Sequence, residues 1–334
     1  MSTASIQQQI FIGGCSRSGT TLLGAMIGTH KDVVCTPESH FKMDVLRSPM
    51  QLESGVDTQQ AVNYIQQHWR FKLWELALDD TAVPYDAIGS DYGQLLNHIA
   101  GTYAATHNKP DATVWVDHTP ENISYTETLL TLFPNAKFIH IVRDGRGVAA
   151  SIMSLDWGPN SIIKTARWWM RMVSFGLAVE TAVSPSKIIR VRYEDLVCNP
   201  ETTLQQLCDF LELDYQPEMV NATGFIPPSY TTRQHTFVGE KPNPAIAYRW
   251  QQKLSPREIE IFENQTRNFL QLLNYEPQYG INAKSPTFTE IQKGKIKELV
   301  RGEIINKIKW LKRSYPLWLS KDFYTRANFS DTNN

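Results

Sequence analysis

One stretch near the start of the chain determines how the rest is arranged. It reads Ile10-Phe-Ile-Gly-Gly-Cys-Ser-Arg-Ser-Gly-Thr-Thr-Leu-Leu23. An apolar run of strand length passes through a turn of small residues into an apolar segment without proline, which is typical of a helix. A strand that enters a helix through such a turn directs backbone N–H groups and a helix N-terminus at one point. The stretch therefore predicts a binding site for a phosphate or another anion.

The loop departs from the phosphate loop of ATPases at one position. That pattern has Gly, four residues, Gly, then Lys and Ser or Thr. Gly14 and Gly19 have this spacing and Thr21 fills the hydroxyl position, but Thr20 stands in place of the lysine. The only cation within the loop is Arg17. The sequence thus indicates a phosphate-binding loop that is not built in the manner of an ATPase.

The composition is that of a globular protein with a core, since 42% of the 334 residues are hydrophobic and 20% are charged. The formal net charge is -1, so the overall charge gives no sign of a nucleic-acid partner, and we expect none. The four cysteines are scattered without a Cys-x-x-Cys pair, which favours reduced thiols over disulfides or a zinc site. The segment 1–9 is polar, unlike a signal peptide, and no apolar run reaches the roughly 20 residues of a membrane span. We therefore expect a cytoplasmic protein.

Predicted strands alternate with predicted helices along the chain. The strands are expected at 10–14, 33–34, 113–117, 136–142 and 187–192. The helices are expected at 20–29, 58–78, 91–107, 121–133, 160–181 and 200–211. Two more are expected, one that follows Arg143-Asp-Gly-Arg-Gly147 and runs on through Ser151, and one that begins at the capping sequence Ser255-Pro-Arg-Glu258. This alternation predicts an α/β, P-loop-like fold of three layers, with a central, mainly parallel sheet flanked by helices. Residues 221–248, rich in Pro, Gly and Thr, are expected to form a loop over the site.

The end of the chain has a different character, and we assign 1–280 to the α/β domain and 281–334 to a basic, amphipathic helical tail. Residues 293–313 hold eight Lys or Arg and two Glu, with apolar residues at helical spacing. Such a helix could contact an anionic membrane peripherally through residues 293–319. The plainer alternative is a terminal helix docked on the core with a solvated charged face, and we favour this alternative.

Three segments that follow predicted strands carry groups suited to phosphate, and ligands of open α/β sheets bind at the carboxyl ends of the strands. The first is the loop with Arg17. The second holds Arg143, with Ser151 eight residues further on. The third is Arg192-Tyr193, where the tyrosine ring could pack beside a base or its hydroxyl could reach a phosphate. Two separated phosphate sites and an aromatic ring suggest a nucleotide that is phosphorylated at both ends.

Each of these residues also has a structural interpretation. Arg143 could form an ion pair with the adjacent Asp144, and Tyr193 could simply pack in the core. The functional interpretation is favoured because the three segments follow successive strands.

Together these motifs resemble the family of sulfotransferases that depend on PAPS, 3′-phosphoadenosine 5′-phosphosulfate. The resemblance covers roughly residues 9–275 and rests on three segments, Ser16-Arg-Ser-Gly-Thr-Thr-Leu-Leu23, the Arg143…Ser151 pair and Arg192-Tyr-Glu-Asp-Leu196. Within the family the chain is most similar to the branch of tyrosylprotein and bacterial sulfotransferases. The segments that favour this branch are Thr29-His-Lys-Asp-Val33, leading to Glu38, and Trp250…Leu254-Ser-Pro256.

The resemblance implies roles for individual residues. The residues that would hold the 5′-phosphosulfate are Arg17, Ser18, Gly19, Thr20 and Thr21. Those that would bind the 3′-phosphate are Arg143 and Ser151, and the residue that would contact the nucleotide is Tyr193. The implied catalytic residues are Arg17, Glu38 as the base, and His118, which stands where this branch has a lysine near the leaving group. Lys241 lies in a segment that closes over PAPS in the family.

The expected reaction moves the sulfonate group of PAPS to an acceptor hydroxyl by in-line displacement, with release of PAP. The acceptor hydroxyl would belong to a tyrosyl residue, a saccharide or a lipid-linked alcohol. We expect no metal, because a sulfonate carries less charge than a phosphoryl group and no aspartate of a second strand is clearly placed to hold Mg²⁺. Two alternatives stay open, a P-loop kinase that uses ATP–Mg²⁺, against which Thr20 argues, and a nucleotide-binding protein without catalysis. The motifs do not specify the oligomeric state.

Overall fold

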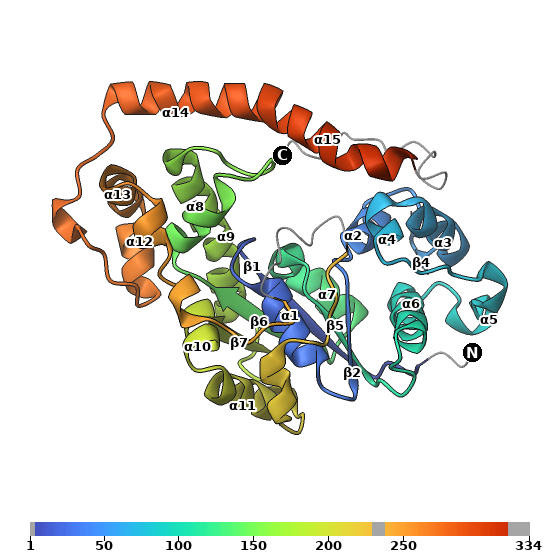
Figure 1. Cartoon of the computed structure of the whole chain (residues 1–334). Coiled ribbons are helices and arrows are strands. Elements are labelled where there is room, and N and C mark those ends of the chain that lie inside the picture. The colour runs from blue at the N-terminus through green and yellow to red at the C-terminus, as the bar shows by residue number, and fades with distance from the viewer. Residues whose placement is uncertain (1–3, 229–237, 320–334) are drawn as a thin grey trace.

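A sheet of five parallel strands forms the centre of the molecule in the computed structural model, which describes residues 4–228 and 238–319 (Figure 1). The strand order is β2-β5-β1-β6-β7. Their bounds are β1 Gln8–Gly14, β2 Val33–Thr36, β5 Val114–Asp117, β6 Lys137–Val142 and β7 Ile188–Arg192. Every pair of neighbours is parallel, so the predicted α/β fold is confirmed. The order places β1, and the loop that follows it, in the middle of the sheet.

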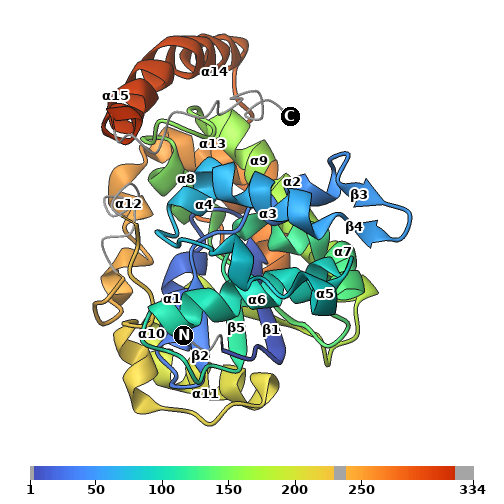
Figure 2. The same ribbon diagram turned by 90° about the vertical axis from the view of Figure 1, so that its right-hand side faces the viewer.

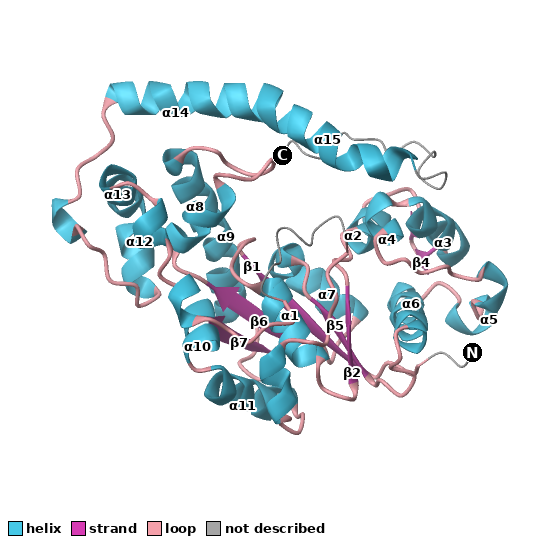
Figure 3. Ribbon diagram, viewed as in Figure 1, coloured by secondary structure: helices cyan, strands magenta, loops and turns pink. Residues whose placement is uncertain are grey.

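Alternate side chains of β1 enter two separate cores, because successive residues of a strand point to opposite faces. Ile10 and Ile12 face one side, which is covered by α1 (Thr20–Gly28), α10 (Tyr193–Cys198) and α11 (Pro200–Leu211). Phe11 faces the other side, which is covered by α2 (Phe41–Leu46), α3 (Thr58–Gln67), α6 (Tyr92–Thr106) and α7 (Thr126–Leu132). The sheet therefore lies between two helical layers (Figures 1 and 3).

A third core lies beyond the carboxyl end of β6. It is formed by α8 (Gly145–Ile152), α9 (Ile162–Ala182), α12 (Trp250–Lys253) and α13 (Pro256–Leu272). The predicted capping sequence begins α13, where Ser255 and Glu258 satisfy each other's backbone N–H groups. This core supports the loops at the carboxyl ends of the strands from one side.

Two predicted helices were wrong in extent. The helix expected over 58–78 ends at Gln67, because His68 is extended and its Nδ1 accepts the N–H of Arg70, which begins the short α4 (Trp69–Lys72). The helix expected over 121–133 begins as a 3₁₀ turn, Pro120–Tyr125, before α7. The smaller remaining elements are β3 (Gln51–Leu52), β4 (Gly55–Val56), α5 (Tyr85–Ile88) and the 3₁₀ turns Asp80–Ala82, Pro217–Asn221, Pro244–Ile246 and Gly280–Asn282. Residues 229–237 of the loop expected over the site lie outside the described residues.

The tail forms a long helical rod of three consecutive segments, α14 (Phe288–Val300), a π-helical turn (Arg301–Ile305) and α15 (Asn306–Leu319). In Figure 1 the rod crosses the top of the molecule from the side of α12 and α13 towards α2 and α4, and Figure 2 shows it from the end of α15. Glu298 joins it to the core by accepting hydrogen bonds from Asn160 and Ser161 at the start of α9. Among the described helices, none is long and apolar enough to cross a membrane.

Candidate active site

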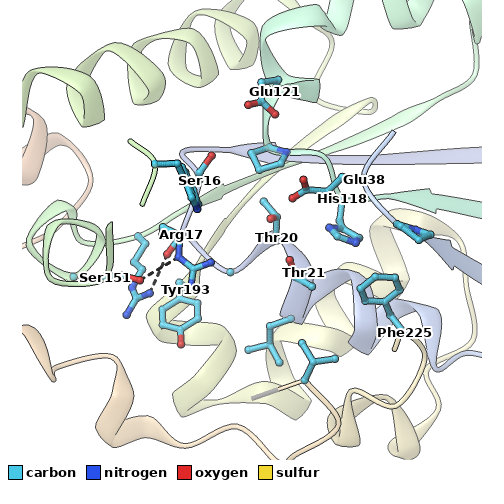
Figure 4. Close-up of a pocket in the computed structure, with 18 of the residues that line it drawn as sticks. Ser16, Arg17, Thr20, Thr21, Glu38, His118, Glu121, Ser151, Tyr193 and Phe225 are labelled. Carbon is cyan, nitrogen blue, oxygen red and sulfur yellow. Dashed lines mark hydrogen bonds between the residues drawn. The ribbon is translucent and has the colours of Figure 1, made fainter. Parts of the chain in front are cut away.

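The loops at the carboxyl ends of the strands surround a cavity of about 400 Å³. Arg17 follows β1, His118 follows β5, Arg143 follows β6 and Tyr193 follows β7, and all four side chains line the cavity. Figure 4 shows Arg17 between two groups of residues, with Ser151 and Tyr193 on one side and Glu38 and His118 on the other. The cavity thus has an arginine-rich half and a half that holds a carboxylate and an imidazole.

The phosphate loop presents an open helix N-terminus to this cavity. Gly19 is the N-cap residue of α1, with a left-handed φ of 102°, and no side chain caps the helix. The N–H groups of the first turn have no acceptor within the helix, and Thr20, Thr21 and Leu22 line the cavity. The buried hydroxyl of Ser18 has no hydrogen-bond partner in the described part of the protein. These donors suit an anion.

Arg17 and Arg143 lie beside each other at the edge of this loop. The Nε atom of Arg17 donates to the Ser151 hydroxyl, 3.1 Å away, and Nη1 of Arg143 donates to the Arg17 carbonyl oxygen, 2.9 Å away. Burial and the nearby Arg143 lower the pKa of Arg17. Two partly buried guanidinium groups repel each other, so an anion bound between them would be stabilised by both.

The arginine that pairs with Asp144 is Arg146, not Arg143. Arg146 forms two ion pairs, in which its Nη2 lies 2.7 Å from the Asp144 carboxylate and its Nη1 lies 2.5 Å from the Glu263 carboxylate. No ion pair within residues 4–228 and 238–319 involves Arg143, and its buried Nε has no hydrogen-bond partner there. The alternative of a structural ion pair between Arg143 and Asp144 is therefore excluded by this geometry.

Tyr193 is a wall of the cavity as well as a core residue. The guanidinium group of Arg143 lies over the Tyr193 ring, with its central carbon 4.2 Å from the ring centroid. The ring also packs against Gly19, where an added Cβ would lie only 2.5 Å from Cδ2 of the ring. The ring thus fixes the distance between the phosphate loop and the loop that carries Arg143.

In the other half of the cavity, Glu38 is held by two basic side chains. Nε2 of His40 lies 2.9 Å from Oε2 of Glu38, and Nη1 of Arg70 lies 3.3 Å from the same oxygen. Burial alone would raise the pKa of Glu38, but His40 and Arg70 hold this pKa well below its ordinary value. Nδ1 of His40 lies 3.7 Å from Glu121, so this imidazole stands between two carboxylates. Glu38 is ionised at neutral pH in this setting.

His118 faces the same half of the cavity as a neutral imidazole. The residue is buried, its ring lies edge-on to Phe225 with centroids 4.9 Å apart, and burial lowers its pKa. Neither ring nitrogen has a hydrogen-bond partner in the described residues. Buried polar atoms are rarely left without partners, so these nitrogens indicate a ligand contact.

An aspartate does follow a second strand, although the sequence did not reveal it as a clear metal ligand. Asp117 ends β5, beside β1, and Nζ of Lys42 lies 2.9 Å from its Oδ2. Ser39 and Thr119 also donate to this carboxylate, and the Lys42 ammonium further reaches Asn122. No cluster of three or more potential metal ligands occurs among the residues with described positions.

A comparison with known families bears on this arrangement. A model of the sulfotransferase family matches residues 9–217, which include the phosphate loop, Arg143, Ser151 and Tyr193. The chain belongs to the sulfotransferase family. It is similar to the protein-tyrosine sulfotransferase of Drosophila melanogaster, with 26% identity over 280 residues, which cover 80% of this chain and 52% of that protein. Protein-tyrosine sulfotransferase 1 of Homo sapiens is 28% identical over 259 residues, which cover 74% of this chain and 64% of that protein. The match thus spans only about half to two thirds of these relatives.

Solved structures support the sulfotransferase fold. The sulfotransferase domain of the Synechococcus PCC 7002 olefin synthase superposes with a TM-score of 0.55 and 22% identity, covering 82% of this chain and 96% of that one. The sulfotransferase domain from the curacin biosynthetic pathway gives a TM-score of 0.53 and 20% identity, covering 83% and 99%.

Nine of the eleven predicted site residues line the cavity of this family member, and Ser18 is buried within the phosphate loop beside it. Lys241 is exposed and does not line the cavity. Two other cations, Arg249 and Lys253, line it instead, and burial together with Arg249 and Arg143 lowers the pKa of Lys253. Both belong to the segment around Trp250 that carried part of the family resemblance, so the sequence did hold a signal for them. His40 and Arg70 were not predicted from the sequence as partners of Glu38.

Proposed function

We propose that this member of the sulfotransferase family transfers the sulfonate group of PAPS to a hydroxyl group and releases PAP. The observation that carries the proposal is the placement of Arg17 and Arg143, which come from two loops and meet at the open N-terminus of α1. The buried Ser18 hydroxyl and Arg143 Nε offer donors to such a ligand. A nucleotide that carries phosphate at both ends fits this donor set, because it brings two anionic groups to one cavity.

Each anionic group has its own set of donors. The phosphate loop and the first turn of α1 would hold the 5′-phosphosulfate through backbone N–H groups and the side chains of Thr20 and Thr21, which line the cavity. The buried Ser18 hydroxyl, which has no partner among the described residues, would add a donor from within the loop. Arg143 and Ser151 would hold the 3′-phosphate, with Arg249 and Lys253 adding positive charge to the same wall. Arg17 touches both sets, since it belongs to the loop and donates to Ser151.

In the reaction, the acceptor oxygen bonds to sulfur while the bond between sulfur and the 5′-phosphate oxygen breaks. The electron pair of that bond stays on the departing phosphate, where Arg17 and the loop N–H groups can stabilise the growing charge. The acceptor proton goes to the Glu38 carboxylate. A carboxylate of lowered pKa suffices for this step, because the acceptor hydroxyl becomes strongly acidic as its oxygen bonds to sulfur.

His118 is proposed to donate a hydrogen bond to the sulfonate or the departing oxygen. Its neutral ring reaches the cavity wall opposite Ser151, and its nitrogens have no partner among the described residues. A neutral donor suits this place, because a second positive charge would compete with Arg70 for the Glu38 carboxylate.

The acceptor is proposed to be a tyrosyl residue, a saccharide or a lipid-linked alcohol. The relatives named protein-tyrosine sulfotransferases favour the first of these. Four tryptophans line the cavity, namely Trp69, Trp157, Trp250 and Trp310. Indole faces pack well against phenol rings, sugar rings and alkyl chains, so the three classes are compared directly in the experiment.

The test uses PAPS with a labelled sulfonate and three acceptors, a tyrosyl peptide, an oligosaccharide and a long-chain alcohol in detergent. We expect label on at least one acceptor, and calorimetric binding of PAP that is much tighter than binding of ATP–Mg²⁺. Preferred binding of ATP–Mg²⁺ would support the kinase alternative instead. Tight PAP binding with no transfer to any of the three would contradict the proposed acceptor classes and favour a binding protein.

A further inference from the structure

The helical rod of the tail packs its polar side against the core. The packed row on this side consists of Gly294, Glu298, Asn306 and Trp310. Gly294 lies against Ser161, Glu298 and Asn306 form hydrogen bonds with Ser161 and Asn160, and Trp310 lines the cavity. Glu298 accepts hydrogen bonds from the backbone of Asn160 and from the Ser161 hydroxyl, and Asn306 donates to Asn160 at 3.1 Å. Because these contacts are specific hydrogen bonds, they fix which side of the rod faces the protein.

The opposite side of the rod is apolar and exposed. A row of Ile296, Val300, Ile304 and Ile308, also spaced by four, is offset by two residues from the packed row, and its members are 61, 41, 56 and 48% exposed. Leu299 and Leu311 extend the surface beside the row, with 65 and 47% exposure. A helix that docks on a core ordinarily buries its apolar stripe. Here the stripe points outwards, so we call these six residues the outer stripe.

The π-helical turn keeps the outer stripe straight. In an uninterrupted α-helix, residues spaced by four advance by roughly 40° around the axis at each step, because a turn holds 3.6 residues. The turn at Arg301–Ile305 takes more residues than an α-helical turn, so it compensates part of this advance in the middle of the rod. Both the packed row and the outer stripe therefore remain on opposite sides from α14 into α15.

Exposed lysines border the outer stripe. Those between 293 and 312 are Lys293, Lys295, Lys297, Lys307, Lys309 and Lys312. The two acidic residues of this range are already engaged, since Glu298 binds Ser161 and Glu303 pairs with Lys307 at 2.6 Å. The stripe thus combines an apolar centre with a strongly basic rim.

We propose that the outer stripe lies on the surface of a membrane that contains anionic lipids. An exposed apolar stripe with a lysine rim matches the apolar and anionic layers of such a surface. A second copy of the chain is disfavoured as the occupant, because pairing two outer stripes would bring two rims of lysines together. The rod would then lie flat in the interface, with its polar side and the rest of the protein above it.

This orientation has a consequence that rests on the proposed function. Trp310 belongs to the rod and lines the candidate active site, so the cavity borders the membrane-facing helix. A hydroxyl group carried by a lipid or by a membrane-anchored molecule would thus be presented close to the cavity. Transfer to an acceptor held in anionic vesicles is expected to exceed transfer to its soluble analogue.

Co-sedimentation of the full chain with vesicles tests the proposal without using activity. We expect binding to phosphatidylcholine vesicles that contain about 30% phosphatidylserine, and on the order of tenfold weaker binding to vesicles of phosphatidylcholine alone. The variant I296N/I304N/I308N removes the apolar centre and should lower the affinity for anionic vesicles about tenfold or more. A matched control, I226N/I281N, changes two isoleucines that are 85 and 84% exposed but lie outside the stripe, and it should bind as the unchanged protein does.

Two further measurements separate the possible outcomes. PAP binding is measured for each variant, and it should be unchanged, since none of these residues lines the cavity. Failure of the unchanged protein to bind anionic vesicles, or equal binding by the stripe variant, would overturn the membrane proposal and leave the proposed function untouched. A dimer in sedimentation equilibrium that the stripe variant abolishes would overturn it as well, because the stripe would then be an interface between copies.

Discussion

The ammonium group of Lys42 lies 2.9 Å from Oδ2 of Asp117, and both side chains are buried next to His118, which lines the candidate active site. Asp117 ends the strand beside β1, a place where P-loop enzymes that use ATP hold Mg²⁺ with an aspartate. In this protein the buried ammonium group of Lys42 neutralises the charge of that aspartate. The loop, conversely, has Thr20 where those enzymes have a lysine. Both features disfavour the binding of ATP–Mg²⁺ and favour the binding of an anion that arginine side chains hold.

The first prediction concerns the stability that depends on this pair. Changing Lys42 to Met leaves the Asp117 charge buried without its partner, which should lower the free energy of unfolding by about 3–5 kcal/mol. The double variant K42M/D117N removes the charge as well and should recover part of this loss. Urea unfolding of both variants measures the difference, and equal losses in the two would contradict a charge effect.

The same pair predicts how stability depends on pH. Burial would raise the pKa of Asp117, but Lys42 and the hydrogen bonds from Ser39 and Thr119 lower it to about 2. The folded pKa thus lies below the unfolded value of about 3.9, and the stabilisation is complete above that value and lost as the pH falls towards 2. Between these limits, D117N should lose less stability with falling pH than the unchanged protein. A parallel decline in both proteins would contradict this assignment.

Much of the fold and half of the site could be predicted because they depend on patterns among residues that are close together in the sequence. A buried parallel strand reads as an apolar run, and the loop is defined by two glycines five positions apart, so Arg17, Arg143 and Tyr193 were found at the strand ends. The Lys42–Asp117 pair joins residues 75 positions apart, and no local pattern reports such a contact. The break at His68 depends on one side chain capping the next turn, which periodicity does not reveal.

The tail shows a different limit of sequence reasoning. Its periodicity indicated a helix, and the structure forms this helix and joins it to the core through Glu298. The apolar stripe was visible in the sequence, but only the hydrogen bonds of Glu298 and Asn306 reveal that this stripe faces outwards. Periodicity identifies the two sides of a helix and does not say which side is packed.

The second prediction tests the proposed site for the 3′-phosphate. Changing Arg143 to Ala removes a charged donor from that site, which should weaken PAPS binding by about 10- to 150-fold, since a hydrogen bond to a charged group contributes about 1.5–3 kcal/mol. A donor that lacks the 3′-phosphate, adenosine 5′-phosphosulfate, should lose much less. Calorimetry with both nucleotides makes the comparison, and Arg167, an exposed arginine outside the cavity, provides a matched control in R167A. Equal losses for both donors would refute the assignment.

The third prediction concerns Glu38 as the base. Changing Glu38 to Gln keeps the shape of the side chain but removes its ability to accept a proton, so turnover should fall by about 10²–10⁴. PAP affinity should stay nearly unchanged, because the carboxylate lies in the half of the cavity away from Ser151 and Tyr193. Single-turnover transfer of labelled sulfonate and PAP calorimetry are measured on the same preparation. Undiminished turnover would remove Glu38 from this role.

The fourth prediction uses the surroundings of Glu38. His40 and Arg70 oppose the effect of burial and hold the pKa of Glu38 below its ordinary value, so the acid limb of its rate profile should lie below about pH 4.3. Changing Arg70 to Met removes a positive charge 3.3 Å from the carboxylate, which should raise this pKa and move the acid limb to higher pH. The rate is followed down to the lowest pH at which circular dichroism shows both proteins folded, and the acid limb of R70M is compared with that of the unchanged protein. An acid limb above about pH 4.3 in the unchanged protein that R70M leaves in place would show that Glu38 does not control the rate.

The fifth prediction compares two glycines that both have a positive φ but differ in their surroundings. Gly19 has φ 102°, and a Cβ there would lie 2.5 Å from Cδ2 of Tyr193, whereas Gly89 has φ 57° and nothing within 4 Å. G89A should therefore cost only the backbone strain, about 1–3 kcal/mol of unfolding free energy. G19A adds a steric conflict that must displace the Tyr193 ring or the loop, so it should destabilise more and also weaken PAP binding. Urea unfolding and calorimetry on both variants test this, and equal effects on PAP affinity would show that the contact between Gly19 and Tyr193 does not shape the nucleotide site.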